Sequence, residues 1–366
     1  MYDMFFVLIM CVFTMVISLI VTPLVKKLAV TVGAVDNPNK RRVNIKPMPT
    51  IGGLAIFISF FISAFFLQPL STQTVLPVFI ASSFIIVTGL IDDIKEISPL
   101  AKILGIVIAA TIIYYFTDIK LEMITIPIFG EIHFGVLSLP MTLIWILGIT
   151  NAINLVDGLD GLASGISIIA LSTMGIIGFF FLGFENVEIS IMLFTLVAAI
   201  VGFWPYNFFP ASIFLGDTGA LFLGFMIAVF SLNGLKNVTF ISLVIPIVIL
   251  GIPITDTLYA IIRRKLKKLP ISAADKHHIH HRLMGLGLSH RQTVLAIYSL
   301  GIIFSIIALL YKMSTFWGTI ILSIGVIVGV EIFVEVIGLI DPGRTPFLNF
   351  VKKLFKKAKS DEKPNK

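Results

Sequence analysis

The sequence predicts an all-α integral membrane protein of about eleven transmembrane helices, with the N-terminus outside and the C-terminus in the cytoplasm. Of the 366 residues, 57% are hydrophobic and only 13% are charged, and the mean hydropathy is +1.05. A soluble chain of this length does not bury so much apolar surface. Long apolar runs alternate with short polar connections, and Lys and Arg gather in every second connection, as in polytopic membrane proteins.

Eleven apolar runs approach the roughly 20 residues that a helix needs to cross a bilayer. In chain order they are 4–25, 51–67, 75–90, 103–116, 140–153, 162–184, 189–204, 219–232, 238–261, 292–311 and 315–339. We expect the first run to be a retained span, because Lys26 and Lys27 follow it and no basic segment precedes it. The runs 103–116 and 140–153 are short, so their helices are expected to extend into flanking residues.

The distribution of basic residues sets the expected orientation. An outside N-terminus places six segments on one side of the membrane, namely 26–50, 91–102, 154–161, 205–218, 262–291 and the tail from 340. These segments hold 24 of the 27 Lys and Arg residues, and the other side holds Lys120, Lys236 and Lys312. The positive-inside rule assigns the richer side to the cytoplasm.

Two further segments complete the predicted organisation. Outside the membrane, residues 120–140 alternate in polarity around a glycine and are expected to form a short hairpin. At the other end of the chain, residues 341–366 form a basic tail, which we expect to lie on the anionic inner leaflet. The sequence therefore divides into a polytopic membrane domain, 1–340, and a basic cytoplasmic tail, 341–366.

Four cytoplasmic connections carry most of the polar chemistry of the chain. They contain "TGLIDDIKEIS" (88–98), "NAINLVDGLDG" (151–161), "FLGDTG" (214–219) and "ADKHHIHHRLMGLG" (274–287). A single carboxylate at a helix end is commonly no more than a solvated residue. External connections of similar length have no such set of Asp, Asn and His, so we expect the four segments to converge on one site at the membrane–cytosol interface.

The residue types in these segments suit a hard divalent cation and phosphate. The candidate oxygen ligands are Asp92, Asp93, Asn154, Asp157, Asp160 and Asp217. Magnesium usually takes one or two carboxylates, while phosphates and water complete its shell. The candidate phosphate-binding side chains are Lys102, His277, His278, His280, His281 and Arg282. A histidine cluster can also hold a transition metal, although the only cysteine, Cys11, lies in the first apolar run.

The motifs "IDDIKE", "NAINLVDGLDGLASG", "FLGDTGALFLG" and "HHIHHRL", in this order, resemble those of the polyprenyl-phosphate N-acetylhexosamine-1-phosphate transferases of glycosyltransferase family 4. The segment "VDNPNKRRVNIKPMPTIGG" (35–53) resembles the family's N-terminal signature, so the resemblance spans residues 35–284. The "HIHHRL" motif and the basic tail after an eleventh span are more similar to the branch that uses UDP-N-acetylglucosamine (UDP-GlcNAc). The alternative branch uses UDP-MurNAc-pentapeptide in peptidoglycan synthesis.

The resemblance implies a role for each candidate residue. The catalytic groups would be Asp92, Asp93, Asp157 and Lys102. The substrates would be bound by Asp160, Phe214, His277, His278, His280, His281, Arg282 and Lys46. The metal, Mg²⁺ with Mn²⁺ as a substitute, would be held by Asp217 and Asn154. In this scheme Phe214 would stack on the uracil ring and Asp160 would face its edge.

The reaction implied by the resemblance transfers GlcNAc-1-phosphate from UDP-GlcNAc to undecaprenyl phosphate and releases UMP. It would be the first membrane step of wall teichoic acid or related envelope glycan synthesis in a bacterial plasma membrane. A single in-line displacement is favoured, because a phosphate monoester is already largely anionic near pH 7. A covalent aspartyl-phosphate on Asp92 or Asp93 is the alternative. The expected partners are the two substrates and the bilayer, and no nucleic acid is expected. The sequence leaves open whether the protein forms a homodimer.

A cation- or proton-coupled transporter is the alternative from a different class of protein. Transporters place ionisable side chains within their spans, and the candidates here are Asp256, Glu331 and Glu335. Glu331 and Glu335 are four residues apart and share a helix face, so we expect a hydrogen-bonded helix contact. Asp256 is expected to anchor the end of its helix near Arg263.

Overall fold

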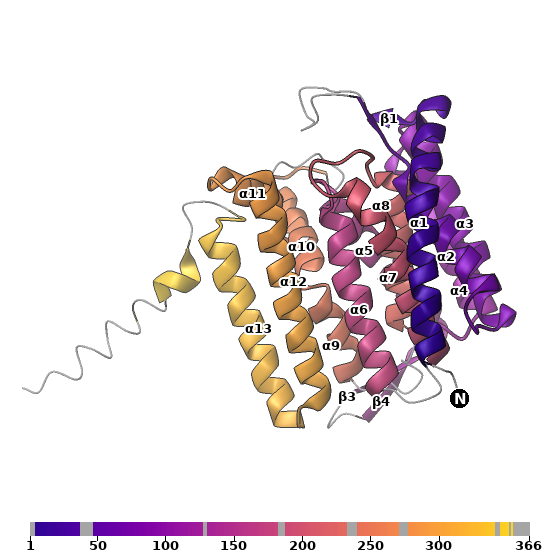
Figure 1. Ribbon diagram of the computed structural model, residues 1–366. Helices are drawn as coiled ribbons and strands as arrows, with labels where there is room; N and C mark the ends of the chain where they lie inside the picture. Colours follow the sequence, from indigo (N-terminus) through magenta and orange to yellow (C-terminus); the bar gives the residue numbers. More distant parts are fainter. Residues whose placement is uncertain are drawn as a thin grey trace, which may run out of the picture.

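The computed structural model describes residues 4–36, 47–126, 130–181, 187–232, 240–270, 277–340, 345–350 and 353. Its α-helices are α1 (Met4–Val32), α2 (Gly52–Phe66), α3 (Thr72–Lys95), α4 (Pro99–Phe116), α5 (Ser138–Val156), α6 (Leu162–Phe181), α7 (Val187–Asn207), α8 (Gly216–Leu232), α9 (Phe240–Ile249), α10 (Gly251–Leu266), α11 (Ile279–Gly285), α12 (His290–Met313) and α13 (Phe316–Val336). Its strands are β1 (Val35–Asp36), β2 (Met48–Pro49), β3 (Met123–Ile126) and β4 (Gly130–His133). The long helices run side by side and form one bundle (Figure 1).

Within the described ranges, eight helices are long and apolar enough to cross a membrane. They are the helices at Phe5–Val32, Thr72–Lys95, Pro99–Phe116, Gly135–Val156, Leu162–Phe181, Val187–Asn207, His290–Met313 and Phe316–Val336. Two further apolar helices, α2 and α8, are shorter, with 15 and 17 residues. Helix is present in all eleven predicted runs, and the prediction of an all-α integral membrane protein is confirmed.

The ninth predicted run, 238–261, is not one continuous helix. It is divided into α9 and α10 between Ile249 and Gly251. Pro253 has no N–H to donate to the carbonyl of Ile249, and its ring disfavours a regular helix through this turn. The N–H of Leu250 still donates to the carbonyl of Pro246 at 2.9 Å, so α10 follows α9 directly.

The two short runs extend into flanking residues, as the sequence predicts. Helix α4 begins at Pro99, which is suited to the first helical position because no N–H is needed there. Ser98 caps α4 and accepts a hydrogen bond from the N–H of Ala101. Helix α5 extends over Ser138–Val156, so both helices gain length at the expense of the connections.

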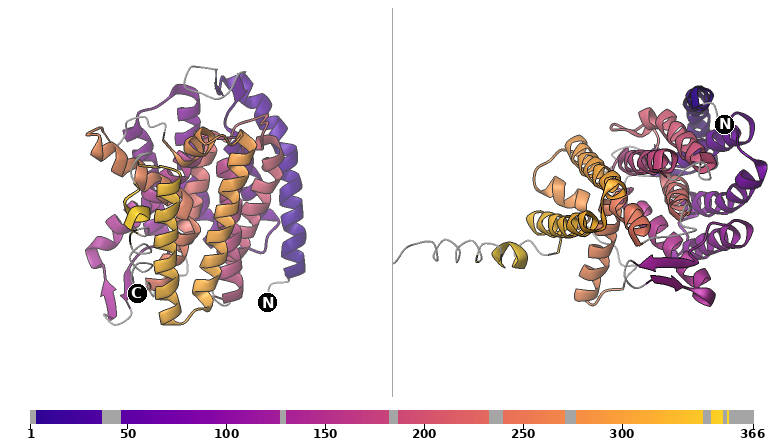
Figure 2. Two further views of the ribbon diagram at one scale, coloured as in Figure 1. Left: turned by 90° about the vertical axis from the view of Figure 1, so that its left-hand side faces the viewer. Right: turned by 90° about the horizontal axis from the view of Figure 1, so that it is seen from below.

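The hairpin predicted for 120–140 is present as an antiparallel pair of β3 and β4, in which Met123 pairs with His133 and Ile126 with Gly130. A 3₁₀ turn at Gly135–Leu137 leads into α5. The hairpin lies at the same end of the bundle as the N-terminus, and β1 and α11 lie at the opposite end (Figures 1 and 2). We call this opposite end, which carries β1 and α11, the polar end.

Helix α8 is the central helix of the bundle. Every residue from Thr218 to Leu232 is buried, and α2, α3, α5 and α6 contact α8. A helix that is apolar on all sides requires packing partners on all sides. Glycines allow the close approach at its first turn, since a Cβ added at Gly53 would lie 2.0 Å from Cα of Gly219, and one added at Gly89 would lie 2.4 Å from Cα of Thr218. This packing places the "GDTG" segment at the polar end.

Candidate active site

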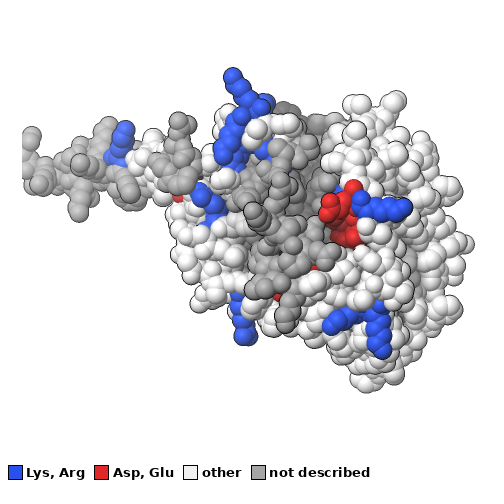
Figure 3. Space-filling model, turned by 90° about the horizontal axis from the view of Figure 1, so that it is seen from above, with Lys and Arg blue, Asp and Glu red and all other residues white. Residues whose placement is uncertain are grey.

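The segments that the sequence singles out meet at the polar end of the bundle. The C-terminal ends of α3 and α5 and the N-terminal ends of α4 and α8 supply their side chains to one place. Seen from this end, acidic side chains form a patch with basic side chains beside it, and further Lys and Arg lie around the rim (Figure 3). The predicted convergence of the "IDDIKE", "NAIN" and "GDTG" segments is therefore confirmed.

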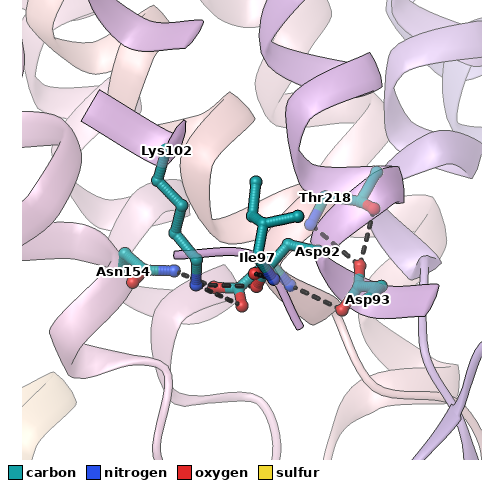
Figure 4. Close-up of polar contacts among 7 residues, drawn as sticks. Asp92, Asp93, Ile97, Lys102, Asn154 and Thr218 are labelled. Atoms are coloured by element: carbon teal, nitrogen blue, oxygen red, sulfur yellow. Dashed lines mark hydrogen bonds and ion pairs between the residues drawn. The ribbon is translucent and has the colours of Figure 1, made fainter. Parts of the chain in front are cut away.

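Lys102 bridges two carboxylates that are far apart in the sequence. Its Nζ lies 2.6 Å from Oδ2 of Asp92 and 3.0 Å from Oδ2 of Asp217 (Figure 4). The other oxygen of Asp92, Oδ1, accepts a hydrogen bond from the N–H of Ile97 at 2.9 Å. Asp92 is buried, with only 6% of its surface exposed, and each of its oxygens has a nitrogen donor within 2.9 Å.

Asp93 binds the first turn of α8. Its Oδ1 accepts from the N–H of Asp217 at 3.0 Å, and its Oδ2 accepts from the N–H and the hydroxyl of Thr218 at 2.9 and 2.6 Å (Figure 4). The first N–H groups of a helix have no partner within the helix and carry a partial positive charge, so a carboxylate stabilises them. Gly216 has φ of +74°, and a Cβ there would lie 2.6 Å from Oδ2 of Asp93. Asp93 thereby positions Asp217.

Asn154 and Asp157 come from the end of α5. The amide Nδ2 of Asn154 donates to Oδ1 of Asp217. Asp157 follows at the helix end and is partly buried. Burial, and then the negative charges of Asp217, Asp93 and Asp160, raise the pKa of Asp157 well above its ordinary value. The cluster thus brings the carboxyl groups of Asp92, Asp93, Asp157 and Asp217 together with Lys102.

This donor set fits a magnesium ion in its chemistry. In the part of the chain that the structure describes, no three His, Cys, Asp or Glu side chains form a group that could hold a metal ion. Magnesium requires only one or two protein carboxylates, because water and phosphate oxygens fill its other positions. Asp217 supplies a carboxylate, and the side-chain amide of Asn154, which donates from Nδ2 to that carboxylate, lies next to it. The metal assignment to Asp217 and Asn154 stays a prediction.

The N-terminal signature segment binds directly to the "FLGDTG" segment. The N–H of Phe214 donates to the carbonyl of Pro49 at 2.8 Å, and the N–H of Gly52 donates back to the carbonyl of Phe214 at 3.0 Å. Gly53 continues this contact by donating to the carbonyl of Leu215 at 2.9 Å. The side chain of Phe214 is partly exposed, and its predicted role in stacking stays a prediction. Lys46, the remaining candidate of this segment, lies outside the described residues.

Asp160 makes contacts that the sequence did not indicate. Its Oδ2 accepts from the N–H of Ala211 at 2.9 Å, and its own N–H donates to Nε2 of His290 at 3.1 Å. The ring of Phe209 stacks on His290 with centroids 4.4 Å apart. The predicted contact of Asp160 with the uracil edge stays a prediction. His290 was missed as a site neighbour, and the signal for it was its place at the start of a span that follows a cytoplasmic connection.

The histidine-rich segment lies against the "VDGLDG" connection. His280 is buried on α11, and a Cβ added at Gly158 would lie 2.5 Å from its imidazole ring. The ring of His281 lies beside it, with centroids 4.2 Å apart. Burial, and then the nearby His281, His278 and His290, lower the pKa of His280 to about 3, so this ring is neutral near pH 7.

The remaining polar residues of this segment contact neighbouring helices. Nδ1 of His278 lies 2.9 Å from Oδ2 of Asp256. Arg282 donates from Nη2 to the carbonyl of Gly338, just beyond α13. Arg282 thus uses part of its donor capacity away from any substrate, and its predicted role in phosphate binding stays a prediction, as do those of His277, His278 and His281.

The three intramembrane acids make protein contacts. The hydroxyl of Tyr259 donates to Glu331 at 2.7 Å, which confirms the predicted helix contact. Glu335 accepts from the N–H groups of Phe347 and Leu348 at 2.7 and 2.9 Å. Asp256 binds the segment that contains His278, and its predicted anchoring of the helix end near Arg263 stays a prediction.

The sequence of this chain is similar to those of known proteins. Residues 75–235 match the model of the family described as glycosyl transferase family 4. The chain is 46% identical over 342 residues to the probable undecaprenyl-phosphate N-acetylglucosaminyl 1-phosphate transferase of Bacillus subtilis (strain 168). The aligned region covers 93% of this chain and 94% of that protein. It is 33% identical over 315 residues to the decaprenyl-phosphate N-acetylglucosaminephosphotransferase of Mycobacterium tuberculosis (strain H37Rv), covering 77% of both chains. It is 31% identical over 312 residues to the phospho-N-acetylmuramoyl-pentapeptide-transferase of Clostridium beijerinckii, covering 81% of this chain and 92% of that protein.

Proposed function

The chain belongs to glycosyl transferase family 4, and we propose that it transfers GlcNAc-1-phosphate from UDP-GlcNAc to undecaprenyl phosphate. The products are undecaprenyl-diphospho-GlcNAc and UMP. The observation that carries the chemistry is the bridge of Lys102 between Asp92 and Asp217 at the polar end of an apolar bundle. There a lipid-borne phosphate can meet a water-soluble nucleotide.

The choice of donor rests on the relatives. The relative with 46% identity along nearly its whole length is named as a GlcNAc-1-phosphate transferase, whereas the pentapeptide transferases are only 30–31% identical. In a bacterial plasma membrane, the product would start wall teichoic acid or a related envelope glycan. The transporter alternative loses its main support, because Glu331 and Asp256 are bound to protein groups.

The proposed topology has eleven crossings, an outside N-terminus and a cytoplasmic polar end. Helices α9 and α10 together form one crossing in this arrangement. The segregation of 24 of the 27 Lys and Arg residues onto one side supports this orientation. The acidic patch then faces the compartment that holds nucleotide sugars.

The proposed metal is Mg²⁺, with Mn²⁺ as a substitute, held by Asp217 and Asn154. Both substrates are anionic and must approach a cluster in which carboxyl groups outnumber Lys102. When bound, a divalent cation supplies the positive charge that stabilises phosphoryl oxygens during transfer.

The chain's own residues have separable parts in a single in-line displacement. Lys102 binds phosphate oxygens, Phe214 stacks on the base, and Asp92 orients the lipid phosphate through Lys102. An oxygen of the lipid phosphate attacks the β-phosphorus of the donor, and the bond from that phosphorus to the UMP oxygen breaks. Both oxygens of Asp92 are already engaged by Lys102 and Ile97, which supports direct displacement over a covalent aspartyl intermediate.

The test is a donor panel with purified protein in lipid nanodiscs. Undecaprenyl phosphate, Mg²⁺ and one of UDP-GlcNAc, UDP-GalNAc or UDP-MurNAc-pentapeptide are supplied, and UMP release and the mass of the lipid product are measured. We expect the largest rate with UDP-GlcNAc and its loss on addition of EDTA. UMP release only from the pentapeptide donor would assign the chain to the peptidoglycan branch, and release of UDP would exclude phospho-sugar transfer.

A further inference from the structure

The polar end contains a buried carboxylate to which the proposed mechanism assigns no role. Asp256 lies on α10 and is only 2% exposed. A buried carboxylate is costly unless it is paired and hydrogen-bonded. We infer that Asp256 is a positioning residue that acts through His278, and this inference rests on the function proposed above.

The two oxygens of Asp256 bind two different parts of the histidine-rich segment. Oδ2 lies 2.9 Å from Nδ1 of His278, and Oδ1 accepts from the N–H of Ile279 at 2.9 Å. The first contact is to a side chain, and the second is to the first residue of α11. Asp256 therefore orients an imidazole ring and also holds the start of the helix that follows it.

The contact with Nδ1 selects one form of the His278 ring. An ionised carboxylate accepts a hydrogen bond, so Nδ1 carries the hydrogen as the donor, and Nε2 is the nitrogen left for another partner. His278 is 7% exposed, so water offers little competition for this bond. The chemistry available at Nε2 of His278 thus depends on Asp256.

Helix α11 transmits this placement to the acidic cluster. The His278 and His280 rings are nearly parallel, at 3°, with centroids 5.9 Å apart. The His280 ring in turn lies against Gly158, which follows Asp157. A change in the position of His278 therefore reaches the connection that carries Asp157.

The two contacts can be separated by two substitutions. In Asp256→Asn, the amide oxygen still accepts from the N–H of Ile279, while the amide N–H faces Nδ1 and moves the hydrogen of the neutral ring to Nε2. In Asp256→Ala both contacts are lost. Glu331→Gln is the matched control, because it changes another intramembrane acid that binds α10 through Tyr259 and does not contact the histidines.

The experiment measures UMP release and backbone hydrogen exchange on full-length protein in nanodiscs. We expect Asp256→Asn to lower kcat/KM by on the order of 10- to 100-fold with unchanged exchange at residues 277–285. Asp256→Ala should lower kcat/KM at least as much and also increase exchange at Ile279. Glu331→Gln should resemble wild type in both measurements.

A double variant separates action through His278 from general packing. If Asp256 acts through His278, adding Asp256→Asn to His278→Gln should cause little further loss of kcat/KM. Independent, multiplicative losses, or wild-type kcat/KM in Asp256→Asn, would overturn the inference. Absence of UMP release by wild-type protein with every donor would instead reject the proposed function, while the exchange at Ile279 would still test the contact with Asp256.

Discussion

Asp93 and Thr218 are 125 residues apart in the sequence, yet the carboxylate of Asp93 accepts from both the N–H and the hydroxyl of Thr218. The adjacent Asp92 instead binds Lys102. The two neighbouring carboxylates therefore have different partners. One stabilises the start of the central helix, and the other belongs to the charged cluster at the polar end.

This difference predicts distinct outcomes for the two isosteric substitutions. Asp93→Asn removes the negative charge from the start of α8 and should lower stability by about 1 kcal/mol, the usual contribution of a helix cap. Asp92→Asn should mainly reduce the rate of UMP release, with a smaller effect on stability. Thermal unfolding, followed by tryptophan fluorescence, gives the Tm of each variant, and a UMP assay gives its activity. An unchanged Tm with abolished activity in Asp93→Asn would show that Asp93 is catalytic.

Asp217→Asn should reduce turnover by several orders of magnitude, because it removes a principal charge from the proposed metal site, which is worth several kcal/mol of barrier. The fold should persist, since the N–H of Asp217, which binds Asp93, is unaffected. Turnover in saturating Mg²⁺ is the measurement. Glu122→Gln on the hairpin side is the control, with its exposed carboxylate paired to Lys120. Near-wild-type turnover in Asp217→Asn would show that Asp217 does not hold the metal.

Phe214→Ala should weaken binding of the nucleotide sugar more than that of the lipid acceptor. Stacking of a base on an aromatic ring contributes about 1–3 kcal/mol, and the backbone contacts of Phe214 to Pro49 and Gly52 do not depend on the ring. Apparent KM values for both substrates provide the comparison. Phe180→Ala, at a residue that is 70% exposed on α6, is the control for loss of an aromatic side chain. An unchanged KM for the donor would leave Phe214 with a packing role only.

Gly158→Ala should impair activity, because the added Cβ would lie 2.5 Å from the His280 ring and would displace it. The matched control is Gly148→Ala on α5, where, among the described residues, only the surrounding turns of α5 itself lie within 4 Å of the added Cβ. The UMP assay should show a large loss in the first variant and none in the second. Equal activity of both variants would mean that the spacing between His280 and Gly158 has no part in the reaction.

Asp157→Asn should raise Tm at pH 7.5 in the absence of divalent cations. The pKa of Asp157 is raised in the folded protein above the unfolded value of about 3.9. Wild type therefore loses stability as pH rises from the unfolded pKa to the higher pKa of the folded protein. Asn does not titrate, and the difference in Tm should therefore shrink as pH falls toward 4. A Tm series from pH 4.5 to 8.5 tests this trend. A difference that is constant with pH would show that ionisation of Asp157 has no effect on stability.

The membrane class, the presence of helix in the apolar runs, the hairpin and the meeting of the polar segments at one end could all be predicted from the sequence. Each of these depends on local composition, because hydropathy and the positions of Lys and Arg act over one span and its flanks. Even the break between α9 and α10 had a local signal, since Pro253 lies near it.

The partner of each polar group could be identified only from the packing of the helices. Nothing local distinguishes Asp92 from Asp93, or shows that Asp256 binds His278 or that Arg282 binds Gly338. Such contacts depend on how each helix is rotated and how closely it approaches helices far away in the chain. For Asp93, the close packing of Gly89 against Thr218 sets that approach, and a buried carboxylate then binds whichever donors this packing brings within reach.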